Sequence, residues 1–306
     1  MTGRIVEVAE NGRHLSLHRG FLEVAGEDGP LGQVPLDDMD ALLLSAAQIT
    51  LSKALLAALA ERNVAVVVCG RNWHPLSLCT PLAAHHRAAG VLKDQIEASQ
   101  PLRKRLWQHL VAAKIAAQAA VLAGGGTATA LEAMAGRVRS GDPDNLEAHA
   151  ARAYWPALLG PDFRRDPARV GPNSLLNYGY TVLRAATARA LCGAGLNTML
   201  GLHHRSAVNP FALADDVMEP FRPLVDGEVK AIMNEFGDGA GGAAPDLTPE
   251  VKRRLAAVLT LDLAGERGAS PLRNCLQRAA QSLTESLREK RNLLVVAAPP
   301  PPGRML

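Results

Sequence analysis

Alternating apolar and polar residues dominate the first 75 residues and predict a β-rich unit. Strand-like runs such as IVEVA, HLSLHRGFLEVAG and GQVPLDD are separated by glycine, aspartate and proline. The apolar run at 63–69 predicts a buried strand. Just before it, residues 50–62 have helical spacing behind a Thr or Ser cap. We therefore expect a small β-rich N-terminal domain over residues 1–75, with one helix in it.

The apolar spacing becomes helical from about residue 83 onward. Pro75 and Pro81 punctuate the change, so residues 76–82 are predicted to form a linker. A larger all-α domain is expected over residues 83–292, followed by a disordered proline-rich tail over residues 293–306. The expected fold class is therefore α+β. The helices predicted in the larger domain cover 101–122, 142–159, 177–195, 211–225, 252–263 and 272–291.

Two features of the helical region place polar side chains that can do chemistry. Asp142 followed by Pro143 predicts an N-cap and a first helical residue, which puts Glu147 early in a helix. The connection over 196–210 carries His203 and His204.

The composition, 48% hydrophobic and 21% charged residues, is that of an ordinary soluble globular protein. A chain of 306 residues is long enough to bury a core without disulfides. No apolar run approaches the ~18 residues of a membrane span, and the opening residues do not form a signal peptide. We expect a cytoplasmic protein with no membrane partner. The 4 cysteines are scattered without a CxxC spacing, so reduced thiols are expected.

Charge is distributed unevenly, although the net charge is only +3. Residues 81–205 hold 15 Lys or Arg against 8 Asp or Glu, whereas 215–250 holds 9 acids and 2 bases. A metal-assisted phosphodiester site needs both kinds of group, arginines for phosphates and carboxylates for the cation. Solvated helix faces carry such charges too, so the pattern alone leaves both interpretations open.

Several familiar catalytic motifs are missing: there is no P-loop, no GxGxxG after a strand, no GxSxG and no HExxH. A group of acids and histidines remains. Asp215 and Asp216 lie four and three residues before Glu219, which puts Glu219 on a helix face with one or both aspartates. With an upstream histidine this set suits Mn²⁺ or Mg²⁺, but acids near a helix start also serve as caps or dipole partners. Only one of His203 and His204 can point at such a centre, because adjacent side chains diverge.

Other polar residues carry weaker signals. Glu147 taken alone fits an acid favoured by a helix dipole. His85, His86 and Arg87 are suited to phosphate contact, and equally to a solvated basic helix start.

Several longer strings together resemble the CRISPR-associated endonuclease and integrase family of spacer acquisition, most closely its type II branch. They are QITLSKALLAALAERNVAVVVC, HHRAAGVLKDQIEASQPLRKRLWQHLVAAKIAAQAAVL, RVRSGDPDNLEAHAARAYWPALLG, LNYGYTVLRAATARAL and GLHHRSAVNPFALADDVMEPFRPLVD. They extend from Gln48 to Asp226, which is most of the chain. Thr198 stands where the family more often has proline, and the proline-rich tail matches no family motif.

The resemblance implies a catalytic helical domain with one divalent cation, Mg²⁺ or Mn²⁺. Matched motif to motif, its ligands are Glu147, His204 and Glu219, with Asp216 as a candidate partner behind them. The implied reaction inserts short DNA spacers into a repeat array: the 3′-hydroxyl of the fragment attacks a phosphodiester bond of the CRISPR repeat. Candidate DNA contacts are His86, Arg87, Arg184 and Arg205.

The implied partners are double-stranded DNA (prespacer and CRISPR repeat), a second copy in a homodimer formed through the N-terminal domain, and a small second adaptation protein. The last two would form a heterohexameric complex, and the type II effector nuclease is a further candidate partner. Two alternatives remain open from the sequence: a non-catalytic DNA-binding scaffold of the adaptation complex, and an unrelated metallophosphodiesterase acting on nucleotides.

Overall fold

The computed structural model describes residues 4–70, 75–79, 81, 85–204, 206–237, 244–265 and 268–299. It separates into two compact units, Met1–His86 and Arg87–Leu306. The two units are described in turn.

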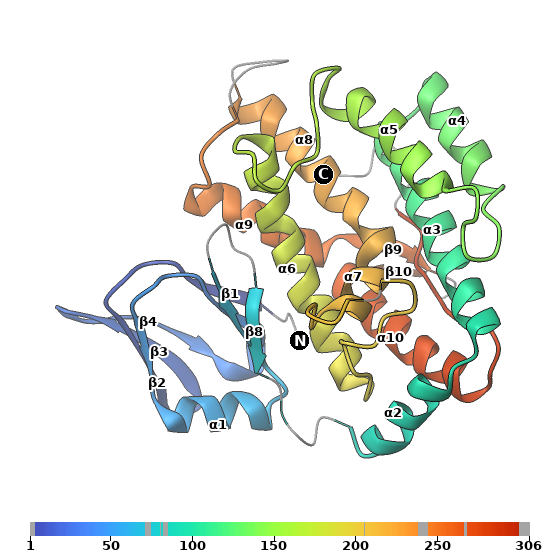
Figure 1. Cartoon of the computed structure of the whole chain (residues 1–306). Coiled ribbons are helices and arrows are strands. Elements are labelled where there is room, and N and C mark those ends of the chain that lie inside the picture. The colour runs from blue at the N-terminus through green and yellow to red at the C-terminus, as the bar shows by residue number, and fades with distance from the viewer. Residues whose placement is uncertain are drawn as a thin grey trace. The chain divides into compact units, whose positions relative to one another are not determined.

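The N-terminal unit is built from two β-sheets, one α-helix and the short 3₁₀ turn η1 (Leu36–Asp38) among its described residues (Figure 1). One sheet has the strand order β1-β5-β7-β8, and the other has the order β4-β3-β2-β6. Helix α1 (Lys53–Glu61) begins after Ser52, whose hydroxyl accepts the Leu55 N–H at 3.2 Å. The strands are β1 (Arg4–Val8), β2 (Arg13–His18), β3 (Phe21–Gly26), β4 (Gly29–Pro35), β5 (Met39–Leu44), β6 (Ile49–Leu51), β7 (Ala65–Cys69) and β8 (Pro75–Cys79).

The alternation in the sequence explains the core of this unit. Leu15 and Leu22 are fully buried and come from β2 and β3, while Leu42 of β5 and Leu55 of α1 pack into the same cluster. The β-rich N-terminal unit with one helix, and the α+β fold class, are thus confirmed.

The predicted linker differs from the structure. Residues 76–79 belong to β8, which pairs antiparallel with β7, and the compact unit extends to His86. The sequence PLSLC has the two-residue period of a strand, and Pro75 occupies its first position, where proline is tolerated. Pro75 therefore begins a strand and does not mark a linker. Residues 80 and 82 lie outside the described ranges.

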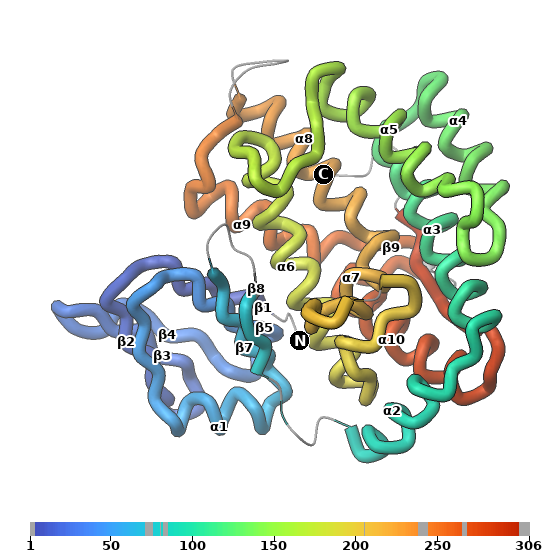
Figure 2. The backbone as a smooth tube through the Cα atoms, in the orientation of Figure 1, coloured from blue at the N-terminus to red at the C-terminus, as the bar shows by residue number. Residues whose placement is uncertain are grey.

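The second unit is mainly helical (Figure 2). Helix α6 packs against α7, α8, α9 and α10, and α3 packs against α4, α5, α8 and the 3₁₀ turn η3. The helices are α2 (Ala88–Glu97), α3 (Gln100–Leu122), α4 (Gly126–Ala135), α5 (Leu146–Leu159), α6 (Pro172–Gly193), α7 (Ala212–Met218), α8 (Arg222–Phe236), α9 (Pro249–Ala257) and α10 (Leu272–Arg288), with the turns η3 (Glu219–Phe221) and η4 (Val258–Thr260).

This unit is not all-α as expected. Strands β9 (Asp262–Gly265) and β10 (Gly268–Pro271) form a small antiparallel sheet. The helix predicted over 252–263 accordingly ends at Ala257, and the following residues form η4 and β9.

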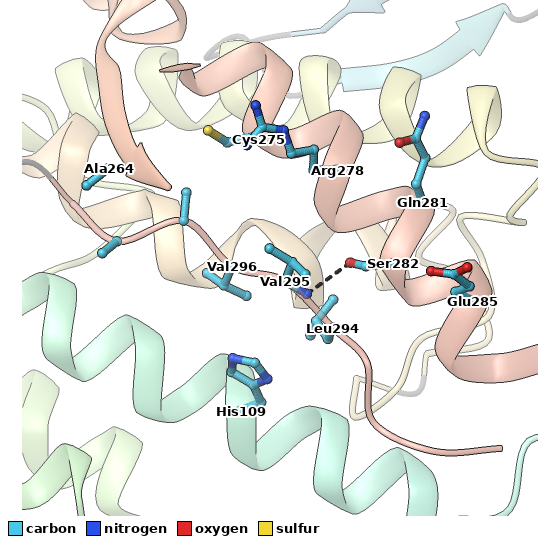
Figure 3. Close-up of a pocket in the computed structure, with 12 residues that line it drawn as sticks. His109, Ala264, Cys275, Arg278, Gln281, Ser282, Glu285, Leu294, Val295 and Val296 are labelled. Atoms are coloured by element: carbon cyan, nitrogen blue, oxygen red, sulfur yellow. Dashed lines mark hydrogen bonds between the residues drawn. The ribbon is translucent and has the colours of Figure 1, made fainter. Parts of the chain in front are cut away.

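The tail predicted to be disordered is partly packed. Leu294 is only 5% exposed, and the N–H groups of Leu293 and Val295 donate to Ser286 and Ser282 of α10, each at 2.9 Å. Figure 3 shows this segment between α10 and His109 of α3, with the hydrogen bond from Val295 to Ser282 as a dashed line. Residues of the segment, of α10 and His109 line a cavity of about 690 Å³. The proline-rich composition predicts disorder and gives no sign of these contacts. Residues 300–306 lie outside the described ranges.

Across the described residues, no helix is both long enough and apolar enough to cross a membrane.

Candidate functional site

The start of α5 positions Glu147. Asp142 accepts the backbone N–H groups of Leu146 at 2.9 Å and Glu147 at 3.0 Å. Asp142 was predicted as the N-cap itself, but the cap position is Asn145, whose side chain makes no capping hydrogen bond. Asp142 thus satisfies the free N–H groups from one turn earlier, and it fixes Glu147 in the first turn.

A lysine joins Glu147 to Glu219. Lys114, in the middle of α3, places its Nζ 2.6 Å from Oε1 of Glu147 and 2.6 Å from Oε2 of Glu219. The side chains of Lys114, Glu147 and Glu219 are 13%, 24% and 6% exposed. Two carboxylates from separate helices therefore meet at one buried positive charge. Burial lowers the pKa of Lys114, but the charges of the two glutamates outweigh it and raise that pKa overall.

Glu219 lies at the junction between α7 and α8. Pro220 and Pro223 are the second residues of η3 and α8, and the helix predicted over 211–225 is divided into α7, η3 and α8. The Arg222 guanidinium lies with Nε 2.9 Å from Oε1 of Glu219. Burial by itself would raise the pKa of Glu219, but Arg222 and Lys114 outweigh burial and lower it, so Glu219 is an anion.

Asp216 holds the loop that carries the histidines. This carboxylate on α7 is fully buried and accepts the backbone N–H groups of Leu202, His203 and His204 at 2.6, 3.0 and 3.2 Å. Its Oδ1 also lies 2.5 Å from Nδ1 of His204. Gly201 permits this approach, because a Cβ there would lie 2.4 Å from the His204 carbonyl oxygen.

The two histidines diverge as predicted. His203 stacks on Trp107, with ring centroids 4.2 Å apart and planes 4° apart. The His204 ring meets Trp107 edge-on, is 46% exposed, and uses Nδ1 for Asp216, which leaves Nε2 for other contacts. The pKa of His204 is raised, first by the Asp216 hydrogen bond and also by the charges of Asp216, Glu219 and Glu147, while burial opposes the shift. His204 is thus within electrostatic reach of both glutamates.

Helix α2 supports the loop from the other side. Gln95 donates to the carbonyl oxygens of Asn197 and Leu200 at 2.8 and 3.0 Å. The carbonyl oxygen of Thr198, the residue where the family more often has proline, accepts the Leu213 N–H of α7 at 2.8 Å. The loop is therefore tied to α2 and α7 without that proline.

A buried hydrogen-bond cluster lies behind the glutamates. Asp226 of α8 accepts Tyr154 of α5 at 3.0 Å and Tyr180 of α6 at 2.5 Å. Burial raises the pKa of Asp226 to about 7, although both tyrosine hydrogen bonds oppose the shift. Arg222 lies 4.7 Å from the Tyr180 ring centroid, so it connects this cluster to Glu219.

The chemistry of these residues fits a divalent cation, although the three side chains are not gathered around one point. Within the described ranges, no group of three or more His, Cys, Asp or Glu is arranged to hold a metal ion. Glu147 and Glu219 nevertheless share one cation, the Lys114 ammonium, which lies 2.6 Å from an oxygen of each carboxylate. Two anionic oxygens and a nearby imidazole are a donor set of the kind suited to Mg²⁺ or Mn²⁺.

The residues predicted to contact DNA differ in exposure and in partners. Arg184 donates from Nε to Asp215 at 2.6 Å and is 20% exposed, so its guanidinium is already engaged. His86 and Arg87 are exposed in a turn at the boundary of the two units. Arg205 lies outside the described residues.

Sequence reasoning missed Lys114, Trp107 and Arg222. A signal for Lys114 existed: Leu110 and Val111, four and three residues before it, are both fully buried, which places the lysine on the apolar face of α3. For Trp107, the stacking on His203 depends on a loop almost 100 residues away, and no local pattern predicts it.

Comparison with known proteins gives consistent matches. The family model described as CRISPR associated protein Cas1 matches residues 6–236. A CRISPR-associated endonuclease Cas1 from Neisseria meningitidis is 40% identical over 261 residues, which is 84% of each chain.

Two solved structures share the fold. A casposase bound to integration product has a TM-score of 0.76 at 20% identity, covering 94% of this chain and 91% of that one. A Cas6-RT-Cas1–Cas2 complex has a TM-score of 0.74 at 21% identity, covering 96% of this chain and 36% of that one. With the family model matching well over half of its residues, the chain belongs to the Cas1 family of CRISPR-associated proteins.

Proposed function

We propose that this protein is a metal-dependent DNA endonuclease and integrase that inserts short foreign-DNA spacers into a CRISPR repeat array. The observation that carries the proposal is that Glu147 and Glu219 meet at the Lys114 ammonium in a Cas1-family chain. His204, whose ring is oriented by Asp216, lies near them. The 40% identical Neisseria relative carries the name endonuclease, and a casposase bound to integration product has the same fold.

In this proposal Glu147, His204 and Glu219 hold Mg²⁺ or Mn²⁺. The bound cation would supply Lewis-acid stabilisation of charge on the phosphate. Asp216 fixes the His204 ring through Nδ1, which presents Nε2 as the ligand atom. Arg222 keeps Glu219 anionic. The 3′-hydroxyl of the DNA fragment loses its proton to solvent and forms the new P–O bond, the bond from that phosphorus to the 3′-oxygen of the repeat strand breaks, and the displaced oxygen takes up a proton, so no net proton is consumed.

The proposed partners follow from the family. The structural neighbour described as a Cas6-RT-Cas1–Cas2 complex supports a Cas2-like small adaptation protein, and a casposase bound to integration product supports a DNA partner, which in this proposal is duplex DNA. We extend the proposal to a homodimer, a heterohexamer with that small protein, recruitment of the type II effector nuclease, and action in the cytoplasm.

The test compares the wild type with His204→Ala on labelled prespacer and repeat DNA, with Mn²⁺ or Mg²⁺ and with a chelator. Loss of a ligand should lower strand transfer by about 100-fold or more. His149→Ala is the matched control, because His149 is exposed on α5, the helix that carries Glu147, and its removal should leave transfer unchanged. Equal transfer by the wild type and His204→Ala would refute the assignment.

One observation favours a different class of function. Lys114 stands between the two glutamates, and the described residues form no complete metal cluster, which is compatible with a non-catalytic DNA-binding scaffold. Metal-dependent product formation separates the two, whereas salt-sensitive DNA binding does not, because counterion release is expected in both. Cleavage of small nucleotides with duplex DNA ignored would instead indicate a metallophosphodiesterase.

A further inference from the structure

Lys114 forms the only ion pair of Glu147 within the described residues, and it forms one of the two that Glu219 makes there. The lysine comes from the middle of α3, Glu147 from the start of α5, and Glu219 from the α7–α8 junction. One ammonium thus links three helical elements at a point that is 13% exposed on the lysine side.

The charges around this ammonium are unequally compensated. Arg222 reaches Oε1 of Glu219, but Oε2 of Glu219 and Oε1 of Glu147 have Lys114 as their common counter-ion. Without Lys114, two largely buried carboxylates would face each other with little compensation, an arrangement that repulsion and desolvation disfavour.

We infer that Lys114 is an internal counter-ion: it holds the two glutamates together in the metal-free protein and competes with a divalent cation for the same carboxylate oxygens. The inference rests on the proposed function, because it assigns the site to metal binding. A lysine suits this role, since its ammonium is a point charge on a flexible four-carbon stem and can withdraw without breaking a bidentate contact. Lys114 is then a positioning residue whose removal affects both stability and metal affinity, in opposite directions.

The experiment measures Mn²⁺ affinity and thermal unfolding of the purified full chain, in wild type and in Lys114→Met. Free Mn²⁺ is followed by electron paramagnetic resonance, and unfolding by differential scanning calorimetry with and without Mn²⁺. We expect Lys114→Met to have a Tm several degrees below wild type without metal, since the carboxylates lose their cation. We expect it to bind Mn²⁺ about tenfold more tightly, and Mn²⁺ to raise its Tm more than that of wild type.

Arg254→Met is the matched control. Arg254 also joins two carboxylates, a buried one at Glu228, 2.7 Å from Nε, and an exposed one at Glu235. Its loss should lower the Tm while leaving Mn²⁺ affinity and the Mn²⁺-induced Tm rise at wild-type values. If Lys114→Met does not purify, Lys114→Gln replaces it, because glutamine keeps a hydrogen-bond donor and removes the charge.

Each outcome has a definite meaning. Equal Mn²⁺ affinity in wild type and in the Lys114 variants overturns the counter-ion inference and leaves the proposed metal site standing. Absence of Mn²⁺ binding in wild type and in both Lys114 variants overturns the metal site of the proposed function and the inference together. Weaker Mn²⁺ binding in Lys114→Met also overturns the inference, since it would make the lysine a helper of metal binding.

Discussion

Gly201 shows how a single missing side chain shapes the site. An added Cβ would lie 2.4 Å from the His204 carbonyl oxygen and 2.9 Å from Oδ2 of Asp216. Neither neighbour can withdraw cheaply, because one is backbone and the other is a fully buried carboxylate bonded to the loop. The close approach of the histidine loop to α7 therefore requires glycine.

We expect Gly201→Ala to lower the free energy of unfolding by about 1–3 kcal/mol through overpacking, and to displace His204. Urea unfolding followed by circular dichroism measures the first effect. Gly193→Ala is the control, because a Cβ at Gly193, in the last turn of α6, meets nothing within 4 Å. If both variants had wild-type stability, the close packing at Gly201 would be refuted.

Asp226 gives a second prediction for a single residue. Burial raises its pKa to about 7 in the folded protein, far above that of an exposed aspartate. Between about pH 4 and pH 7 the folded state therefore binds more protons at this group than the unfolded state, and stability through this group falls as pH rises. The fall amounts to about 4 kcal/mol and is complete once pH exceeds the folded pKa.

We expect Asp226→Asn to remove this component of the pH dependence. Relative to wild type, the variant should gain stability from pH 5 to about pH 7 and then level off by pH 8, as measured by chemical denaturation at each pH. If the unfolding free energies of the variant and wild type differed by a constant amount over this range, the raised pKa of Asp226 would be refuted.

At the scale of the element, the start of α5 depends on a residue outside the helix. Because Asp142 accepts the N–H groups of both Leu146 and Glu147, Asp142→Ala leaves two helix donors to water. We expect a loss of about 1 kcal/mol in unfolding free energy. Asp144→Ala is the neighbouring control, since the ion pair of Asp144 among the described residues is an exposed one with Arg139, and the stability of this variant should stay close to wild type. Equal losses would contradict the capping role.

Local pattern was sufficient for elements whose signal lies within the segment. The buried strand β7, the helix α1 behind Ser52 and the long helix α3 all follow from periodicity and caps. It was insufficient at β8 and β9, because these strands exist through pairing with β7 and β10, and a punctuating proline obscured the first. Pairing partners are not visible in a window of ten residues.

The candidate site was likewise predictable only in part. Glu147, His204 and Glu219 were identified by matching motifs, and the divergence of His203 followed from adjacent side chains pointing apart. The Lys114 contact was not found, because it depends on α3, α5 and the α7–α8 junction meeting in space. The hydrogen bonds that three successive backbone N–H groups donate to Asp216 likewise need the folded loop.

At the scale of the whole molecule, the segment that follows α10 packs back against the helical unit. After α10 the chain turns back along that helix, hydrogen-bonds to Ser282 and Ser286, and reaches β9, where the Ala298 N–H donates to the Ala264 carbonyl at 3.2 Å. Leu294 is the apolar anchor of this return, and it also lines the cavity beside His109 (Figure 3). Residues 293–298, part of the tail that the composition marked as disordered, thus belong to the packed structure.

We expect Leu294→Ala to lower the free energy of unfolding by about 2 kcal/mol, the low end of the range for buried leucines, because the adjacent cavity already leaves contacts unfilled. Val295→Ala is the control: Val295 is 44% exposed, so its truncation removes little buried surface. Chemical denaturation measures both, and hydrogen exchange at the Val295 amide reports whether its bond to Ser282 opens more often in Leu294→Ala. If Leu294→Ala kept both its stability and the protection of that amide, the return segment would not be anchored by the leucine, and the prediction of a disordered tail would regain its force.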